Sequence, residues 1–79
     1  MTLEYKPQVL KQLKKLPKSE VRKIIRKLEQ LVKDPLVGKT LKGELAGLRS
    51  LRVWPYRIIY KIKASRIIIF SIAHRQGAY

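Results

Sequence analysis

Several side chains in the C-terminal half of the chain have the chemistry to act on a phosphate group. Among them are Arg52, Arg57 and Arg75, one histidine, His74, and several tyrosines. Guanidinium groups bind phosphate oxygens through paired hydrogen bonds, and they stabilise the negative charge that grows in a phosphoryl transition state. A tyrosine or histidine beside several cations can have a lowered pKa and can then transfer protons. Together these residue types predict chemistry at a phosphodiester.

The composition narrows the kind of reaction. With no cysteine, one histidine and five acidic residues, the chain lacks a thiolate nucleophile, a thiolate zinc site and an imidazole cluster. We therefore expect no metal site and no other cofactor. RNA carries its own nucleophile, the 2′-OH beside each phosphate, whereas DNA lacks it. RNA is the better substrate prediction, because its cleavage needs only deprotonation of that hydroxyl, stabilisation of the phosphorane and protonation of the departing 5′-oxygen.

The charge of the chain points to an anionic partner. Its 79 residues include 19 Lys or Arg, and the net charge of +14 costs stability through self-repulsion. Nucleic acid, the ribosome or an anionic membrane surface would neutralise this charge, and we favour nucleic acid. A solvated lysine-rich helix face is the alternative, but it does not account for the arginines within strand patterns. No apolar run can cross a bilayer and no signal-peptide core follows Met1, so we expect a cytoplasmic protein without membrane contact.

The hydrophobic periodicity predicts one α+β domain with the order β-α-α-β-β-β. Pro7 suits the first turn of a helix, Pro17 ends that helix, and Ser19 is the expected N-cap of a second helix. The short link makes the helices an antiparallel hairpin, and three β-rich runs form an antiparallel meander packed on it. The run 66–70 is apolar on successive residues, which predicts a central strand. The domain covers residues 1–79, with strands at 2–6, 48–53, 56–63 and 66–73, helices at 7–16 and 19–32, and a loop at 34–47.

The first hairpin of the meander is expected to bring two arginines together. A proline at the second turn position excludes an ordinary type I′ turn, so we expect either a four-residue loop or a cis Trp54-Pro55 bond. Closure then pairs Val53 with Tyr56, Arg52 with Arg57, and Leu51 with Ile58. Like charges placed opposite one another are destabilising unless an anion lies between them. The same register puts Arg57 beside Ile72 and Arg75 near the same end of the sheet. The alternative is that these arginines extend into solvent and bind no ligand.

The order and spacing of several short motifs resemble the RelE/ParE toxin superfamily, in particular its RelE-like branch. The motifs are Leu13-Lys-Lys-Leu-Pro17, Leu41-Lys-Gly, Leu51-Arg-Val, Tyr56-Arg-Ile-Ile-Tyr60 and His74-Arg75 with Tyr79. The resemblance implies the compact fold of a toxin from a type II toxin–antitoxin system. It further implies a metal-independent endoribonuclease that cuts mRNA in the ribosomal A site. The implied partners are the ribosome, its mRNA and an acidic RelB-like antitoxin, together with which the toxin can bind operator DNA.

The resemblance also assigns roles to particular residues. Arg57 matches the phosphate-binding arginine, and Arg75 matches the arginine that stabilises the transition state or assists the leaving group. Tyr79 matches the tyrosine that stacks on the substrate or transfers a proton. Arg52 matches one of two basic positions on the preceding strand, whereas the other basic position is Ser50 in this chain.

Two further residues belong to the predicted substrate-binding set. Lys42 comes from the Leu41-Lys-Gly motif. His74 is expected to point away from Arg75, so a structural or substrate-edge role is favoured over catalysis. Tyr5, Tyr56 and Tyr60 are expected in the core or at a sheet edge. Two other functions stay open: a ParE-like toxin that inhibits DNA gyrase without nuclease activity, and a non-enzymatic basic module that binds RNA or the ribosome.

Overall fold

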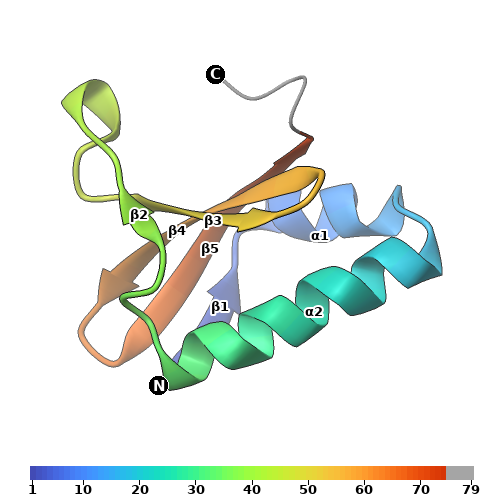
Figure 1. Ribbon diagram of the computed structural model, residues 1–79, viewed down its shortest axis with the longest axis horizontal. Helices are drawn as coiled ribbons and strands as arrows, with labels where there is room; N and C mark the ends of the chain where they lie inside the picture. The colour runs from blue at the N-terminus through green and yellow to red at the C-terminus, as the bar shows by residue number, and fades with distance from the viewer. Residues whose placement is uncertain (75–79) are drawn as a thin grey trace.

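The computed structural model describes residues 1–74, which form two helices and a five-stranded sheet (Figure 1). The predicted α+β class and the β-α-α-β-β-β order are confirmed, with one short strand added. The elements are β1 (Thr2–Tyr5), α1 (Pro7–Lys14), α2 (Lys18–Lys33), β2 (Lys39–Thr40), a 3-10 turn (Gly43–Leu45), β3 (Arg49–Val53), β4 (Tyr56–Lys63) and β5 (Arg66–His74).

The sheet is mixed because β1 joins the meander from its other side. The strand order is β1-β5-β4-β3-β2, with β1 parallel to β5 and the remaining pairs antiparallel. The meander itself is antiparallel as predicted, and β5 is an interior strand as its apolar run indicated. No helix within residues 1–74 is long and apolar enough to span a membrane.

Both helices pack on one face of the sheet, and the core lies between the helices and the sheet. Each helix buries a narrow apolar stripe while its charged residues face outward, which is the pattern of an amphipathic surface helix. We call the opposite side of the sheet the open face. The core residues are Val9, Ile24, Leu28, Leu31, Val53, Tyr56, Ile58, Tyr60, Ile67, Ile69 and Ile72.

The start of α2 differs from the prediction. Pro7 does begin α1 as expected, but Ser19 lies inside α2 and does not cap it. Pro17 occupies the N-cap position, and no side chain caps the helix there. The Pro17 carbonyl instead accepts hydrogen bonds from the N–H groups of Glu20 and Val21. The N-cap prediction was wrong because α2 begins at Lys18, one residue earlier than expected, which puts Pro17 at the N-cap and Ser19 in the first turn.

A β-bulge in β5 corrects the predicted neighbour of Arg57. The pairing shifts between Ile59 and Tyr60, because Phe70 is an extra residue between Ile69 and Ser71. Arg57 therefore lies opposite Ala73 and not opposite Ile72. The bulge lets Ile69 and Ile72, three positions apart, both enter the core.

The segment expected to be a plain loop is pinned to the sheet by two side chains. The buried Tyr60 hydroxyl donates a hydrogen bond to the Pro35 carbonyl at 2.8 Å and accepts one from the Gly38 N–H at 2.9 Å. Arg49 Nη1 donates to the Gly38 carbonyl at 2.9 Å. A Cβ at Gly38 would overlap the Tyr60 ring and hydroxyl, so only glycine allows this approach. The pinned segment leads directly into β2, the strand that the sequence did not reveal.

Two glutamines of α1 continue the pairing of β5 beyond the end of β1. The β1–β5 ladder ends at Tyr5 and Ile69, which leaves the next backbone groups of β5 without a strand partner on that side. Gln12 Oε1 accepts a hydrogen bond from the Ile72 N–H at 2.8 Å, and Gln8 Nε2 donates to the Phe70 carbonyl. The two glutamines are four residues apart, so they share one face of α1. They hold the last part of β5, and with it the bulge, against α1.

Candidate functional site

The β3–β4 hairpin places Arg52 directly opposite Arg57, as predicted. The Trp54-Pro55 peptide is cis, and the turn has two residues because Val53 pairs with Tyr56. The cis alternative is thus confirmed, and the four-residue loop is wrong. The predicted partners Leu51 and Ile58 are also paired. This stretch of sheet matches the sequence-derived register at every position.

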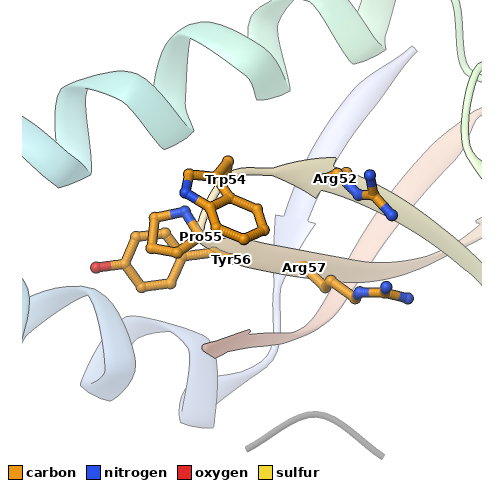
Figure 2. A pocket seen from close by; sticks show the side chains of 5 residues that line it. All are labelled: Arg52, Trp54, Pro55, Tyr56 and Arg57. Atoms are coloured by element: carbon orange, nitrogen blue, oxygen red, sulfur yellow. The ribbon is translucent and has the colours of Figure 1, made fainter. Parts of the chain in front are cut away.

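Both arginines project from the open face of the sheet. Val53 and Tyr56 lie beside them in the hairpin and point into the core, with exposed fractions of 3% and 7%. Alternation along the strands then directs Arg52 and Arg57 to the other face, where their side chains extend in the same direction (Figure 2). Within residues 1–74, neither guanidinium forms a hydrogen bond or an ion pair.

The arginine pair forms a wall shared by two hollows. The tip hollow is lined by Arg52, Trp54, Pro55, Tyr56 and Arg57 (Figure 2). The β2 hollow is lined by Val37, Lys39, Leu41, Ser50, Leu51, Arg52 and Arg57. Neither lining contains a carboxylate, so both hollows attract anions.

The open face carries further cations around this pair. Lys39 lies opposite Ser50 across the β2–β3 ladder, and alternation puts Lys61 on the same face as Arg57. Close to the β1 edge, Arg66 is neutralised by Glu4, whose Oε1 lies 3.0 Å from Arg66 Nη1. The cations of the open face thus extend from the hairpin tip along β4, where alternation also places Lys63.

Comparison with known protein families now identifies the class of this molecule. Residues 3–79 match the family described as the ParE toxin of type II toxin–antitoxin systems, parDE. The chain belongs to this family. It is a toxin of the wider RelE/ParE superfamily.

Individual relatives of the toxin support the same assignment. Toxin RelG of Mycobacterium tuberculosis is 40% identical over 52 residues, which is 62% of this chain and 60% of the length of RelG. The toxin–antitoxin complex RelBE2 from the same organism has a TM-score of 0.86 at 32% identity, covering 94% of this chain and 96% of the matched chain. The archaeal RelE–RelB complex from Pyrococcus horikoshii has a TM-score of 0.78 at 26% identity, with coverages of 98% and 97%. Both solved structures are complexes, of RelBE2 as a toxin–antitoxin pair and of RelE with RelB.

The structure separates the other predicted site residues of the toxin from one another. Ser50 joins Arg52 and Arg57 at the β2 hollow. Lys42 is exposed just before the 3-10 turn and lines neither hollow. Arg75 and Tyr79 lie outside the described residues.

His74 sits on the helix side of the toxin's sheet. It pairs with Tyr56 across the β4–β5 ladder, and the two rings meet edge to face with centroids 5.6 Å apart. It also borders a hollow formed with Gln12 and Lys15 of α1. His74 therefore lies on the face of the sheet opposite Arg57.

Two tyrosines of the toxin have raised pKa values, and both belong to the scaffold. Burial raises the pKa of Tyr60, an effect that Asp34 reinforces and that the Gly38 N–H and Arg49 partly oppose. Burial also raises the pKa of Tyr5, with a further contribution from Glu29. A raised pKa keeps a phenol protonated at neutral pH, so neither residue is suited to act as a base there.

The sequence missed Lys39 as a member of the site. Its signal is weak because β2 has only two residues, too few to show an alternating pattern. A second missed feature is the tip hollow itself. It depends on the direction in which Trp54 and Pro55 leave the hairpin, and residue spacing does not reveal that direction.

Proposed function

We propose that this toxin is a metal-independent endoribonuclease that cleaves mRNA in the A site of the ribosome and thereby inhibits translation. The observation that carries the proposal is the opposed pair Arg52 and Arg57, which faces away from the core and has no anionic partner within residues 1–74. Like charges directly opposite in a sheet destabilise it. A phosphate group between the two guanidinium groups turns this repulsion into a favourable contact.

In the proposed reaction, the 2′-oxygen of the RNA attacks the neighbouring phosphorus. The O2′–P bond forms, the P–O5′ bond breaks, and the products are a cyclic phosphate and a 5′-hydroxyl. The 2′-OH loses its proton and the leaving 5′-oxygen gains one. Arg57 binds the phosphate and stabilises the phosphorane, and Arg52 shares this charge. Lys39, across from Ser50, adds a cation from the next strand.

The roles proposed for the C-terminal residues come from the resemblance to RelE-like toxins. Arg75 stabilises the transition state or assists the leaving group, and Tyr79 stacks on the substrate or transfers a proton. The ribosome contributes geometry, because it holds mRNA near the in-line arrangement that free RNA visits only occasionally. Orientation of this kind supplies several kcal/mol of the barrier in well-studied reactions.

We further propose that an acidic, RelB-like antitoxin silences the toxin and that the pair can bind operator DNA. The net charge of +14 favours an acidic partner, and the similar RelBE2 structure is a toxin–antitoxin complex. Opposite charges steer association, so its rate should fall steeply as salt is added.

Substitution of Arg57 by alanine tests the nuclease proposal. Lys61→Ala is the matched control, because it removes a cation from the same strand and face outside both hollows. Loss of a preorganised charge donor typically lowers a rate about 10²–10³-fold, so Arg57→Ala should do so on saturated ribosomes. Lys61→Ala should change only binding and its salt dependence.

The cleavage products decide between the candidate functions. Toxin induction followed by mapping of mRNA 5′ ends should show cuts at fixed positions within codons. The match to the ParE toxin family favours a gyrase-inhibiting ParE-like toxin as the second candidate. That function predicts DNA damage without mRNA cuts. Normal cleavage by Arg57→Ala would contradict the proposed site, and the absence of both cuts and DNA damage would favour a binding module.

A further inference from the structure

Trp54 lies at the tip of the hairpin that carries the arginine pair. It follows β3 two residues after Arg52 and precedes Arg57 by three, and all three line the tip hollow (Figure 2). Because the three side chains line one hollow, an aromatic surface lies beside the proposed phosphate site.

The Trp54 indole is largely exposed at the tip of the hairpin. The large exposed apolar residues within 1–74 are Met1, Leu10, Leu36, Val37 and Trp54, and only the last is aromatic. Trp54 is 57% exposed, whereas Tyr56 on the far side of the same turn is 7% exposed. The hairpin therefore buries one aromatic ring and presents the other beside two cations.

A nucleotide has two groups that the side chains of this hollow can bind, a phosphate and a base. Their phosphates pair with guanidinium groups, and their bases stack on aromatic rings whatever the sequence. The hollow has a volume of about 280 Å³. That is close to the lower end of the range for small-molecule pockets, roughly 300–1,000 Å³, and it suits a single flat ring system more than a larger ligand.

We propose that the tip hollow is a nucleobase subsite, in which Trp54 stacks on the base of a nucleotide whose phosphate lies against Arg52 and Arg57. The subsite rests on the proposed function, because it supplies the substrate contact of the same reaction. Stacking would fix the position of one base at the hairpin tip and so orient the adjoining phosphodiester. It would act on RNA bases without selecting one of the four.

Trp54 also reports on its own occupancy, because it is the only tryptophan in the chain. The full-length toxin is titrated with a short RNA oligonucleotide made uncleavable by 2′-deoxy substitution, while tryptophan fluorescence is recorded. Base stacking should quench the emission in a saturable way. The same oligonucleotide with abasic residues, and inorganic phosphate alone, should bind without quenching.

Substitutions of Trp54 distinguish aromatic stacking from the contact that any large apolar side chain would make. Trp54→Leu should weaken oligonucleotide binding about 5- to 150-fold, the range expected for one base–aromatic stack, whereas Trp54→Phe should retain most of the affinity. Leu36→Ala is the control, because Leu36 is 66% exposed and lines neither hollow. Fluorescence anisotropy of a labelled oligonucleotide measures all three, and circular dichroism checks that each is folded.

Several results would overturn the subsite. They are the absence of quenching, equal quenching by the abasic oligonucleotide, and equal affinity of Trp54→Leu and wild type. Quenching by an acidic peptide but not by RNA would assign the hairpin tip to a protein partner instead. Failure of the nuclease proposal can be distinguished from failure of the subsite, because these titrations measure binding without cleavage. Base-dependent quenching together with normal cleavage by Arg57→Ala would support the subsite and reject the catalytic role proposed for Arg57.

Discussion

Removal of a single oxygen atom from Tyr60 should destabilise the toxin strongly, because two backbone groups depend on that hydroxyl. Tyr60 is fully buried, and its hydroxyl satisfies the Pro35 carbonyl and the Gly38 N–H at 2.8 and 2.9 Å. Tyr60→Phe keeps the ring and its packing but leaves both groups without this partner. Each unsatisfied buried polar group costs about 1–3 kcal/mol, and partial access of water to the loop places the total near 2–3 kcal/mol.

The magnitude is large for a chain of 79 residues. One kcal/mol shifts the melting temperature of a domain this size by about 4–8 °C, so Tyr60→Phe should lower it by roughly 8–24 °C. Tyr56→Phe is the matched control. It deletes the same atom from the same strand and the same face, but the Tyr56 hydroxyl has no hydrogen bond to any residue in 1–74.

Thermal and urea unfolding followed by circular dichroism test the comparison. Tyr56→Phe should stay within about 0.5 kcal/mol of wild type. Equal losses in the two variants would show that the hydroxyl contacts of Tyr60 contribute little. An unchanged melting temperature in Tyr60→Phe would refute the claim that this residue pins the segment leading to β2.

The same substitution should alter the response to alkali. Burial raises the pKa of Tyr60 above its ordinary value of 10.0, so the folded state holds the phenol proton more tightly than the unfolded chain does. The resulting stabilisation is fully present below pH 10 and is lost as the pH rises through the folded-state pKa. Above about pH 10, the free energy of unfolding should therefore fall more steeply in wild type than in Tyr60→Phe. Parallel curves would contradict this.

Two further substitutions test the edge of β5 and the arginine pair. Gln12→Ala should lower the free energy of unfolding, measured by urea denaturation, by about 1–3 kcal/mol, because the Ile72 N–H loses its acceptor. An unchanged free energy of unfolding would mean that water replaces the side chain. Arg57→Gln should raise the free energy of unfolding by about 0.2–1 kcal/mol while mRNA cleavage falls, since it relieves repulsion with Arg52. A loss of stability in Arg57→Gln would show that the pair is not held at a cost to the fold.

The register of the β3–β4 hairpin could be predicted because local chemistry determines it. Polarity alternates over residues 51–53 and 56–58, on the two sides of Trp54-Pro55, and symmetric closure of the turn keeps Arg52 opposite Arg57. The interior position of β5 was predictable for a similar reason. A run that is apolar at successive residues from Ile67 to Phe70 must be covered on both faces.

The same apolar run concealed the bulge. A strand with alternating polarity shows a phase slip as two consecutive residues of one kind, but residues 67–70 are apolar at every position. The extra residue Phe70 therefore left no mark in the pattern, and the predicted neighbour of Arg57 was wrong by one place. The contacts of Gln8, Gln12 and Tyr60 were hidden for another reason. Each joins segments far apart in the chain, and residue periodicity carries no information about such pairs.

Two arginines on one strand illustrate how structure separates scaffold from site. Arg49 and Arg52 lie three residues apart in β3, so alternation sends them to opposite faces of the sheet. Arg49 donates to the carbonyls of Leu36 and Gly38 and thereby holds the segment before β2. Arg52 has no such bond within residues 1–74, and it faces a second arginine in place of an acceptor. Every buried side-chain polar atom in that part of the chain has a hydrogen-bond partner. A fold that satisfies its buried polar groups so fully, yet opposes two cations at the rim of two hollows, leaves those cations available to an anion from outside.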